Sequence, residues 1–391
     1  MPIVGMVGGG QLARMTAQAA IGLGATFKVL AGSLSDSAAL VTRDPLLGSH
    51  LSVADVSAFA EECDVITFDH EHVPGEILVS LEAAGVLVRP GSAALRCTQD
   101  KLAMREKLTS MGVPCPRFAP VSSAADVSEF VSACCGGSWP VVLKAVTGGY
   151  DGRGVWVVSS PSSAASVVSS AESHGVSLMA EEFVPFRREL AVQAARSPSG
   201  QGAVYPVVET VQVDGICREV IAPAPGLPSA VAEEAGRLAL SIASSLDVTG
   251  LLAVELFETP SGSLLVNELA MRPHNSGHWT MDGSLTSQFE QHLRAVLDLP
   301  LGSPVRCCPG AFTVMANLLG GTIDPDIYDR YLHVMAADPA VKVHFYGKEI
   351  RPGRKIGHVN IAGAPGEPAD SLRDRARRAA SYLRWGTEDG D

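Results

Sequence analysis

A glycine-rich segment that follows a lysine is the part of this sequence best suited to bind a polyphosphate. The apolar residues 141–143 predict a strand that ends at Lys144, and four glycines follow between residues 148 and 154. Because glycine adopts positive φ without steric cost, such a loop can direct successive N–H groups at an anion, and the ammonium group adds charge. Tyr150, Asp151 and Arg153 place an acid and a base beside the phosphates. The alternative is a hairpin turn with incidental charge.

A pair of glutamates on two adjacent strands suggests a cation site. Residues 253–258 and 264–268 flank the turn sequence Thr-Pro-Ser-Gly-Ser, which predicts a β-hairpin. If Thr259 pairs with Leu264, Glu255 lies opposite Glu268 with Cβ atoms ~5 Å apart. Two like charges there destabilise a sheet unless a cation bridges them, and hard oxygen ligands in small number suit Mg²⁺. The alternative is a shifted register that turns one carboxylate to solvent.

Three further segments carry polar side chains in suggestive patterns. Residues 181–184, Glu-Glu-Phe-Val, end a predicted strand, and with Glu189 on the next strand they can offer backbone groups to a purine and a carboxylate to a ribose. The loop 267–280 combines arginine, two histidines, asparagine, serine and tryptophan, which a purely structural loop rarely needs. Residues 348–355 form the one strongly basic segment, where a Pro-Gly turn would bring the cations together. A solvated turn is the alternative for that last segment.

The composition limits the classes of protein. At 391 residues the chain is long enough for two or three domains, and 46% hydrophobic with 18% charged residues fits a globular protein with sizeable cores. The net charge of −12 argues against general binding of nucleic acid or anionic membranes. No apolar run reaches the ~18 residues of a spanning helix. Eight cysteines without Cys-x-x-Cys spacing, and an N-terminus without a basic leader region, predict reduced thiols and a cytoplasmic location.

The elements that must position these residues begin with a small parallel α/β unit. Strands predicted at 3–7, 26–30, 64–68 and 86–89 alternate with helices, and the unit ends near residue 98. The turn at 8–13 matches the G-x-G-x-x-[GA] pattern of nicotinamide dehydrogenases. However, the second strand closes on Ala-Gly-Ser where a ribose-binding acid is needed, and Asp36 comes five residues late. A helix N-terminus that faces a phosphate or a carboxylate remains the expectation.

Helices and linkers divide the rest of the chain. Thr98-Gln99-Asp100 caps a helix that carries Lys101, and prolines 114, 116 and 120 mark a linker into the unit that holds the glycine loop. Helical spacing predicts a lid helix at 161–173 and an amphipathic helix at 229–246. From about residue 304, short strands and loops predict a small C-terminal domain with a polar tail after Trp385.

Taken together, these motifs resemble the ATP-grasp superfamily, and within it the family of 5-(carboxyamino)imidazole ribonucleotide synthases. The matching segments are residues 8–12, 98–101, 148–154, 267–280 and 351–358, and the resemblance extends to about residue 360. It implies an α/β fold (α+β overall). The expected parts are an N-terminal parallel pre-ATP-grasp domain (1–98), a two-lobed ATP-grasp region (99–303) and a small C-terminal domain (304–391). The lid lobe would span about 118–185 and the second lobe about 186–303.

The resemblance also implies a reaction, cofactors and partners. ATP phosphorylates bicarbonate to carboxyphosphate, and the exocyclic amine of 5-aminoimidazole ribonucleotide is then carboxylated, which yields ADP and phosphate. The implied cofactors are ATP and Mg²⁺, or Mn²⁺ in its place. The implied assembly is a homodimer without nucleic-acid or membrane partners.

The resemblance assigns roles residue by residue. It places ATP on Lys101, Lys144, Gly149, Tyr150, Asp151, Gly152, Arg153, Gly154, Glu181, Glu182, Phe183, Val184 and Glu189, with Gln212 near the nucleotide and Asn267 and Glu268 beside the phosphates. It places the metal on Glu255 and Glu268 with Asn267 beside them, and the reacting bicarbonate and amine among Asp151, Lys348, His274, Asn275 and Arg272. It places the ribonucleotide on Tyr150, Arg153, Arg272, Lys348, Arg354 and Lys355, with Gln11, Leu12 and Glu71 reaching it from the N-terminal domain. Gln212 departs from relatives that carry histidine there, and the segment 68–71 is a variable form of an acidic strand end.

Other functions predict different features. Biotin carboxylase chemistry needs a partner with a biotinyl lysine, and the loop 275–280 argues against formate-dependent transformylation of glycinamide ribonucleotide. A nicotinamide dehydrogenase would transfer hydride and use no ATP. A non-catalytic nucleotide sensor would keep Lys144 but would not need Glu255 opposite Glu268.

Overall fold

The computed structural model describes residues 1–149, 152–321 and 327–387. The N-terminal unit is a parallel sheet of β1 (Ile3–Val7), β2 (Thr26–Ala31), β3 (Leu46–Leu47) and β4 (Val65–Phe68), in the order β3-β2-β1-β4. Helices α1 (Gln11–Leu23), α2 (Val53–Ala60), α3 (Gly75–Ala83) and α4 (Ser92–Gln99) complete it. The strand predicted at 86–89 is reduced to a single bridge between Val88 and Ile66. The expectation of a parallel α/β unit is therefore confirmed, although its four-stranded sheet contains the short β3, which was not predicted, in place of a strand at 86–89.

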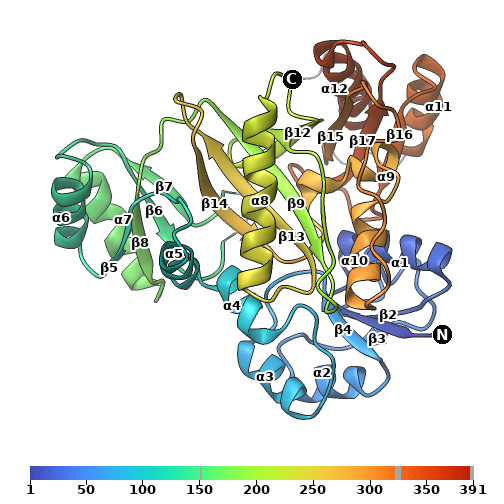
Figure 1. Ribbon diagram of the computed structural model, residues 1–391, viewed down its shortest axis with the longest axis horizontal. Helices are drawn as coiled ribbons and strands as arrows, with labels where there is room; N and C mark the ends of the chain where they lie inside the picture. Colours follow the sequence, from blue (N-terminus) through green and yellow to red (C-terminus); the bar gives the residue numbers. More distant parts are fainter. Residues whose placement is uncertain (150–151, 322–326, 388–391) are drawn as a thin grey trace.

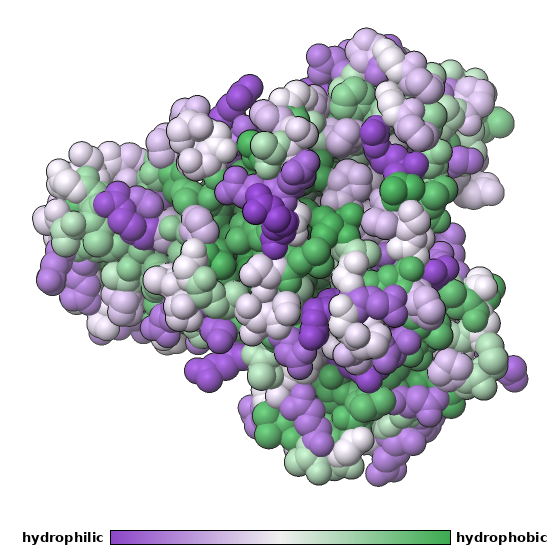
Figure 2. Space-filling model, in the orientation of Figure 1, coloured by the Kyte–Doolittle hydropathy of each residue, from purple (hydrophilic) through white to green (hydrophobic). Residues whose placement is uncertain are grey.

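A second, antiparallel sheet carries the glycine loop. Its strands are β5 (Phe118–Val121), β6 (Val141–Ala145), β7 (Val155–Val158) and β8 (Leu178–Glu182), in the order β5-β8-β6-β7. Helices α6 (Ala124–Cys134) and α7 (Pro161–Ser173) pack on it around a separate apolar core. The predicted lid helix begins where Ser160 caps it and Pro161 takes its first turn. This lobe projects from the molecule at the left of Figures 1 and 2, and helix α5 (Lys101–Ser110) lies between it and the rest.

The third and largest sheet has nine strands and is antiparallel. Its order is β14-β13-β9-β11-β12-β15-β17-β16, with β10 beside β9. The strands are β9 (Arg188–Arg196), β10 (Gly202–Val204), β11 (Val208–Val213), β12 (Ile216–Ala222), β13 (Gly250–Glu258), β14 (Leu264–Ala270), β15 (Thr313–Leu319), β16 (Lys342–Phe345) and β17 (Lys355–Ala362). Helix α8 (Ser229–Ser245) crosses one face (Figure 1). The strands of the C-terminal segment therefore extend the same sheet as the preceding lobe.

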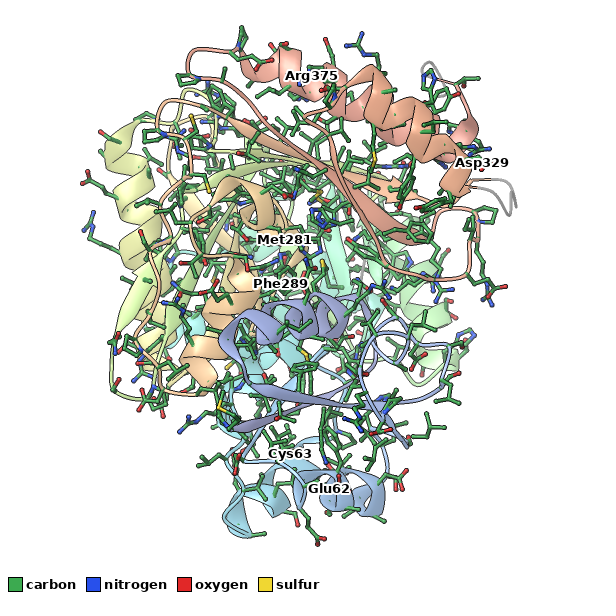
Figure 3. The ribbon with its side chains drawn as sticks, turned by 90° about the vertical axis from the view of Figure 1, so that its right-hand side faces the viewer. Glu62, Cys63, Met281, Phe289, Asp329 and Arg375 are labelled. Atoms are coloured by element: carbon green, nitrogen blue, oxygen red, sulfur yellow. The ribbon has the colours of Figure 1, made fainter. Side chains whose placement is uncertain are left out.

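The remaining helices join the units. The short η1 (Asn275–Gly277) and α9 (Thr280–Gly283) lead into α10 (Gln288–Val296), which packs against α1 of the N-terminal unit. Met281 and Phe289 lie directly above α1 in Figure 3, and Phe289 shares an apolar cluster with Leu12 and Tyr346. Helices α11 (Ile327–Ala337) and α12 (Ala369–Trp385) cover the C-terminal strands. Among the described helices, none is long and apolar enough to cross a membrane.

Candidate active site

A cavity of about 850 Å³ lies where the three sheets meet, and most of the predicted site residues line it. The predicted residues in its wall are Gln11, Leu12, Glu71, Lys101, Lys144, Gly149, Gly152, Glu181, Glu182, Phe183, Val184, Glu189, Gln212, Glu255, Asn267, Glu268, Arg272, His274, Asn275 and Lys355. They come from the N-terminal unit, the lid lobe and the central sheet, although they are up to about 340 positions apart in sequence. Tyr150 and Asp151 lie outside the described residues.

Four predicted residues lie elsewhere. Lys348 and Arg354 line an adjoining cavity of about 830 Å³ together with the turn at residues 8–10. The two cavities share Asp69 and His70, and the Lys348 ammonium donates to the side-chain oxygen of Gln11 in the main cavity wall. Arg153 and Gly154 are not among the lining residues of either cavity.

Three described glycines of the glycine loop, Gly148, Gly149 and Gly152, line the main cavity. Gly149 and Gly152 have φ of 82° and 76°, a region that other residues rarely adopt. A Cβ on Gly149 would lie 2.6 Å from the Arg153 carbonyl oxygen, and one on Gly152 would lie 3.0 Å from the Cα of Gly215. Gly154 accepts a hydrogen bond of 2.8 Å from the N–H of Ala145. The loop thus reaches from the lid sheet to the turn between β11 and β12.

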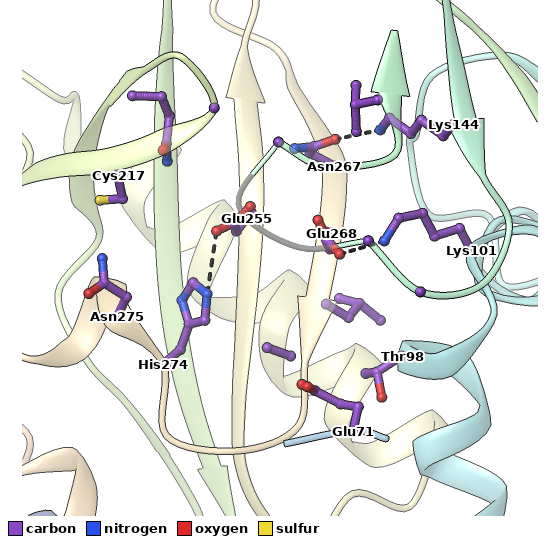
Figure 4. A pocket seen from close by; sticks show the side chains of 18 of the residues that line it. Glu71, Thr98, Lys101, Lys144, Cys217, Glu255, Asn267, Glu268, His274 and Asn275 are labelled. Atoms are coloured by element: carbon purple, nitrogen blue, oxygen red, sulfur yellow. Dashed lines mark hydrogen bonds and ion pairs between the residues drawn. The ribbon is translucent and has the colours of Figure 1, made fainter. Parts of the chain in front are cut away.

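The hairpin places two glutamates opposite one another, but by a different register from the one predicted. Glu258, not Thr259, pairs with Leu264, which alone would set Glu255 opposite Asn267. A β-bulge at Asn267 shifts the ladder by one residue and restores the pairing of Glu255 with Glu268. As a result, Asn267 and Glu268 both direct their side chains into the cavity, although they are neighbours in sequence (Figure 4).

Two lysines neutralise this group of oxygens. Lys101 donates to Glu268 Oε1 at 2.8 Å, and Lys144 donates to Asn267 Oδ1 at 3.1 Å (Figure 4). Lys144 also pairs with Glu181 Oε2 at 2.7 Å. The side chains of Lys101 and Lys144 are only 13% and 12% exposed. The same ammonium groups can bind phosphate oxygens, so a bound polyphosphate would replace the carboxylates that now pair with these lysines.

The two glutamates titrate differently. Burial, the charge of Glu268 and the charge of Glu189 raise the pKa of Glu255 to about 8. Burial alone would also raise the pKa of Glu268, but Lys101, Lys144 and Arg105 together hold it below its ordinary value. Near pH 7 Glu255 therefore keeps its proton, while Glu268 is ionised beside Lys101. Two carboxylates and an amide oxygen on one face are a donor set that fits Mg²⁺ or Mn²⁺.

The loop after β14 adds cationic and neutral hydrogen-bonding groups. His274 Nε2 lies 3.6 Å from Glu255 Oε1 (Figure 4), and burial together with Arg272 and Lys355 lowers the pKa of His274 to about 3, so its ring is neutral. Arg272 pairs with Glu71 at 2.8 Å, which joins the N-terminal unit to this loop. The buried amide nitrogen of Asn275 has no hydrogen-bond partner among the described residues.

A wall suited to a nucleoside stands on the lid side of the cavity. The rings of Phe186 and Phe257 are stacked with centroids 4.7 Å apart. Burial raises the pKa of the nearby Glu189 to about 7, although Lys144 opposes the shift. The carboxylate of Glu182 instead accepts from Arg117 Nε at 2.7 Å, so only its remaining atoms are available to a ligand.

Three residues with direct contacts to this site were not predicted. Asp69 at the end of β4 accepts a hydrogen bond of 2.7 Å from Ala13 N–H, so the carboxylate expected at the N-terminus of α1 belongs to the protein itself. A Cβ on Gly10 would lie 2.1 Å from Asp69 Oδ2, so the glycine turn makes room for that carboxylate. Its position directly after a predicted strand, in a unit with a glycine turn, is the sequence pattern that could have identified Asp69.

Gln288 and Arg105 gave no such signal. Gln288 is buried and clamps the backbone of His274, accepting from its N–H and donating to its carbonyl at 2.9 Å each. Arg105 is buried beneath the lysines and contacts Glu181. Both stand in ordinary helical sequence, where nothing separates a buried polar residue from a solvated one.

Comparison with known proteins agrees with this arrangement. Models of the ribonucleotide synthetase preATP-grasp domain, the ATP-grasp domain and the phosphoribosylaminoimidazole carboxylase C-terminal domain match residues 1–99, 106–289 and 313–371. The N5-carboxyaminoimidazole ribonucleotide synthase of Mycobacterium tuberculosis is 52% identical over 387 residues, which cover 98% of this chain and 88% of that protein. The corresponding protein of Synechococcus elongatus is 41% identical and covers 97% and 93%.

Solved structures give the same result. The N5-carboxyaminoimidazole synthase of Aspergillus clavatus in complex with ADP and 5-aminoimidazole ribonucleotide superposes with a TM-score of 0.87 at 30% identity over 98% of each chain. The synthetase of Thermus thermophilus gives 0.84 at 36% identity, again over 98% of each chain. The chain belongs to the N5-carboxyaminoimidazole ribonucleotide synthase family of ATP-grasp proteins.

Proposed function

We propose that this protein uses ATP and bicarbonate to carboxylate the exocyclic amine of 5-aminoimidazole ribonucleotide, as a step of purine biosynthesis. ADP, phosphate and the N-carboxyamino ribonucleotide are the products. The observation that carries the proposal is the bulged hairpin that turns Glu255, Asn267 and Glu268 toward Lys101 and Lys144 in one cavity. The relatives named for this activity support the choice of substrate.

The phosphoryl-transfer half of the reaction needs positioning and charge neutralisation more than covalent help. Glu255, Asn267 and Glu268 would hold Mg²⁺ or Mn²⁺, which would neutralise phosphate charge when bound. Lys101 and Lys144 would release their present partners, Glu268 and Asn267, and bind phosphate oxygens instead. The side chains of Phe186, Phe257 and Glu189 would flank the nucleoside. The glycine loop would cover the phosphates and exclude water, because carboxyphosphate hydrolyses readily.

The carboxyl-transfer half would take place beside His274. The backbone N–H of Ser276 donates to Nδ1 of the neutral imidazole at 3.4 Å, so Nδ1 is the acceptor and the Nε2–H is left for the cavity. Arg272 and the open amide of Asn275 are donors for the developing carboxylate. Asp151 and Lys348 are proposed to complete this group, and Tyr150, Arg153, Arg354 and Lys355 to hold the ribonucleotide. Lys348 and Arg354 in the adjoining cavity would receive its phosphate, with Gln11 and Glu71 in the wall of the main cavity.

A coupled assay tests the proposal. ADP release should require Mg²⁺ and rise strongly when 5-aminoimidazole ribonucleotide and bicarbonate are both present. Formate with glycinamide ribonucleotide should give no such stimulation. Hydrolysis that persists undiminished in excess EDTA would contradict the metal assignment.

We also propose that the protein works in the cytoplasm as a homodimer. All eight cysteines are free thiols, as expected for a reducing compartment. Size-exclusion chromatography with light scattering should give twice the chain mass of 40.7 kDa, and a monomeric mass would contradict the dimer.

A further inference from the structure

Arg105 is a fully buried arginine that contacts two of the sheets around the cavity. It lies on α5, between the lid lobe and the central sheet (Figure 1), and none of its side chain is exposed. Its Nε donates to Glu181 Oε1 on β8 at 2.7 Å. Its two terminal nitrogens donate to the carbonyl oxygens of Val266 at 3.0 Å and Asn267 at 2.7 Å on β14. All three kinds of guanidinium nitrogen therefore have an acceptor.

These contacts close a ring of four residues. Arg105 binds one oxygen of Glu181, and Lys144 binds the other at 2.7 Å. Lys144 also donates to the Asn267 side chain at 3.1 Å, and the Asn267 carbonyl accepts from Arg105. Three members of the ring line the main cavity, and Arg105 lies behind them.

The two carbonyl contacts depend on the β-bulge. In a regular strand, consecutive carbonyl groups point in opposite directions, so one guanidinium could not bind both. The bulge at Asn267 turns the Val266 and Asn267 carbonyls to the same side. Since β14 is the outermost strand of its sheet, these carbonyls would otherwise have no ladder partner on that side.

The bulge has a competing alternative. If the register of Glu258 with Leu264 continued without a bulge, Glu255 would face Asn267 and Glu268 would turn to the other face of the sheet. Glu268 would then be lost from the cavity. The guanidinium fork stabilises the bulged register, which alone presents both Asn267 and Glu268.

We infer that Arg105 is a positioning residue that sets the affinity of this site for the divalent cation and ATP, by holding the bulge and orienting Lys144 through Glu181. The inference rests on the proposed roles of Glu255, Asn267 and Glu268. Among the described residues, Arg105 donates a hydrogen bond to none of the proposed ligands of the ribonucleotide, and two of those ligands, Arg354 and Lys348, lie in the adjoining cavity.

The test compares Arg105→Lys and Arg105→Met with Lys107→Met, which removes a positive charge from an exposed position of the same helix. Calorimetric titration with Mg²⁺ and a non-hydrolysable ATP analogue measures binding without turnover. We expect Arg105→Met to weaken this binding by tenfold or more and to raise the KM for ATP similarly, with the KM for the ribonucleotide changed less than twofold. Arg105→Lys should keep the ion pair with Glu181 but lose the fork, and so weaken Mg²⁺-dependent binding by several-fold. Lys107→Met should match the wild type.

The outcomes separate this inference from the proposed function. Should the wild type bind the analogue equally with and without Mg²⁺, the proposed metal site is wrong. Should the wild type require Mg²⁺ while folded Arg105→Lys binds as the wild type does, the positioning role of Arg105 is wrong. A folded variant that loses kcat with unchanged metal and ATP binding would likewise contradict a role of Arg105 in the affinity of this site. If Arg105→Met does not fold, Arg105→Lys decides the question.

Discussion

Glu255 and Glu268 should respond in opposite ways when each is replaced by glutamine in the metal-free protein. Sequence spacing treats them as equivalent charges, so that removing either would relieve repulsion. The structure makes them unequal, because burial and Glu268 raise the pKa of Glu255 to about 8 while Lys101 pairs with Glu268 at 2.8 Å. At pH 7 the folded protein therefore keeps a proton on Glu255 and a charge on Glu268.

The effect at Glu255 can be worked out by linkage. In the unfolded chain this carboxyl loses its proton near pH 4.5, while the folded protein holds it up to about pH 8. Below pH 4.5 the carboxyl is protonated in both states, so its raised folded pKa costs no stability. Between the unfolded and the folded pKa, each pH unit lowers the free energy of unfolding by about 1.4 kcal/mol. At pH 7 the loss approaches ~3 kcal/mol. Since 24% of the side chain is exposed, Glu255→Gln should stabilise the metal-free protein by about 1–3 kcal/mol.

Glu268→Gln should be neutral or destabilising. It removes the partner of Lys101, and a hydrogen bond to a charged group contributes about 1.5–3 kcal/mol. Exposure of 46% of the Glu268 side chain and relief of Glu255 offset most of this, which leaves a loss of at most about 1 kcal/mol.

Thermal unfolding in EDTA at pH 5, 7 and 9 checks both values. The gain from Glu255→Gln should shrink toward pH 5, because that pH lies only slightly above the unfolded pKa of 4.5 and little of the penalty has yet developed. Both variants should lose most of their Mg²⁺-dependent activity. Equal shifts for the two variants, or a pH-independent gain, would refute the unequal titration.

Three further predictions concern the substrates. Arg354→Ala should raise the KM for 5-aminoimidazole ribonucleotide about ten- to a hundredfold and leave the KM for ATP unchanged, since a charge-assisted hydrogen bond contributes roughly 1.5–3 kcal/mol. Lys348→Ala should lower kcat more than it raises KM. If steady-state kinetics show that Arg354→Ala raises the KM for ATP instead, this turn does not bind the ribonucleotide. Mg-ATP should slow tryptic cleavage after Arg153, and equal cleavage with and without it would contradict a covering role of the loop. Burial raises the pKa of Glu189 to about 7, so the fraction of this carboxylate that is ionised and can bind the ribose increases with pH. The KM for ATP should therefore fall about tenfold from pH 6 to 8. A Glu189→Gln enzyme with the same pH profile would contradict this.

Many residues that line the main cavity could be predicted, because they lie at the ends of strands and helices that the hydrophobic pattern of the sequence indicates. Lys144 ends a strand with a clear apolar pattern, and the glycines that follow require a loop. The pairing of Glu255 with Glu268 was predicted correctly from an incorrect register. The residue type at Asn267 does not predict the bulge, because the residue that holds it is distant in sequence. The Asn267 carbonyl accepts a hydrogen bond from Arg105, 162 positions away.

Tertiary contacts explain the other differences. Nothing local to Gln288 shows that its amide will clamp His274, because the partner comes from a different segment. Residues 348–355 form a basic turn as predicted, but long-range contacts such as the hydrogen bond from the Ser37 hydroxyl to the Tyr346 carbonyl hold this segment beside the N-terminal glycine turn. The C-terminal strands were predicted as such, whereas their place in the central sheet depends on β12.

The continuity of that sheet has a consequence for synthesis on the ribosome. The N-terminal sheet is complete once residue 68 has emerged and the lid sheet once residue 182 has, so each can form early. The central sheet begins at Arg188 but receives β15, β16 and β17 only between residues 313 and 362. Until then β12 is an open strand edge, which is prone to pair with other chains. From residue 182 to residue 362 the nascent chain therefore carries two finished sheets and an unfinished third, and truncation before residue 313 leaves that edge permanently exposed.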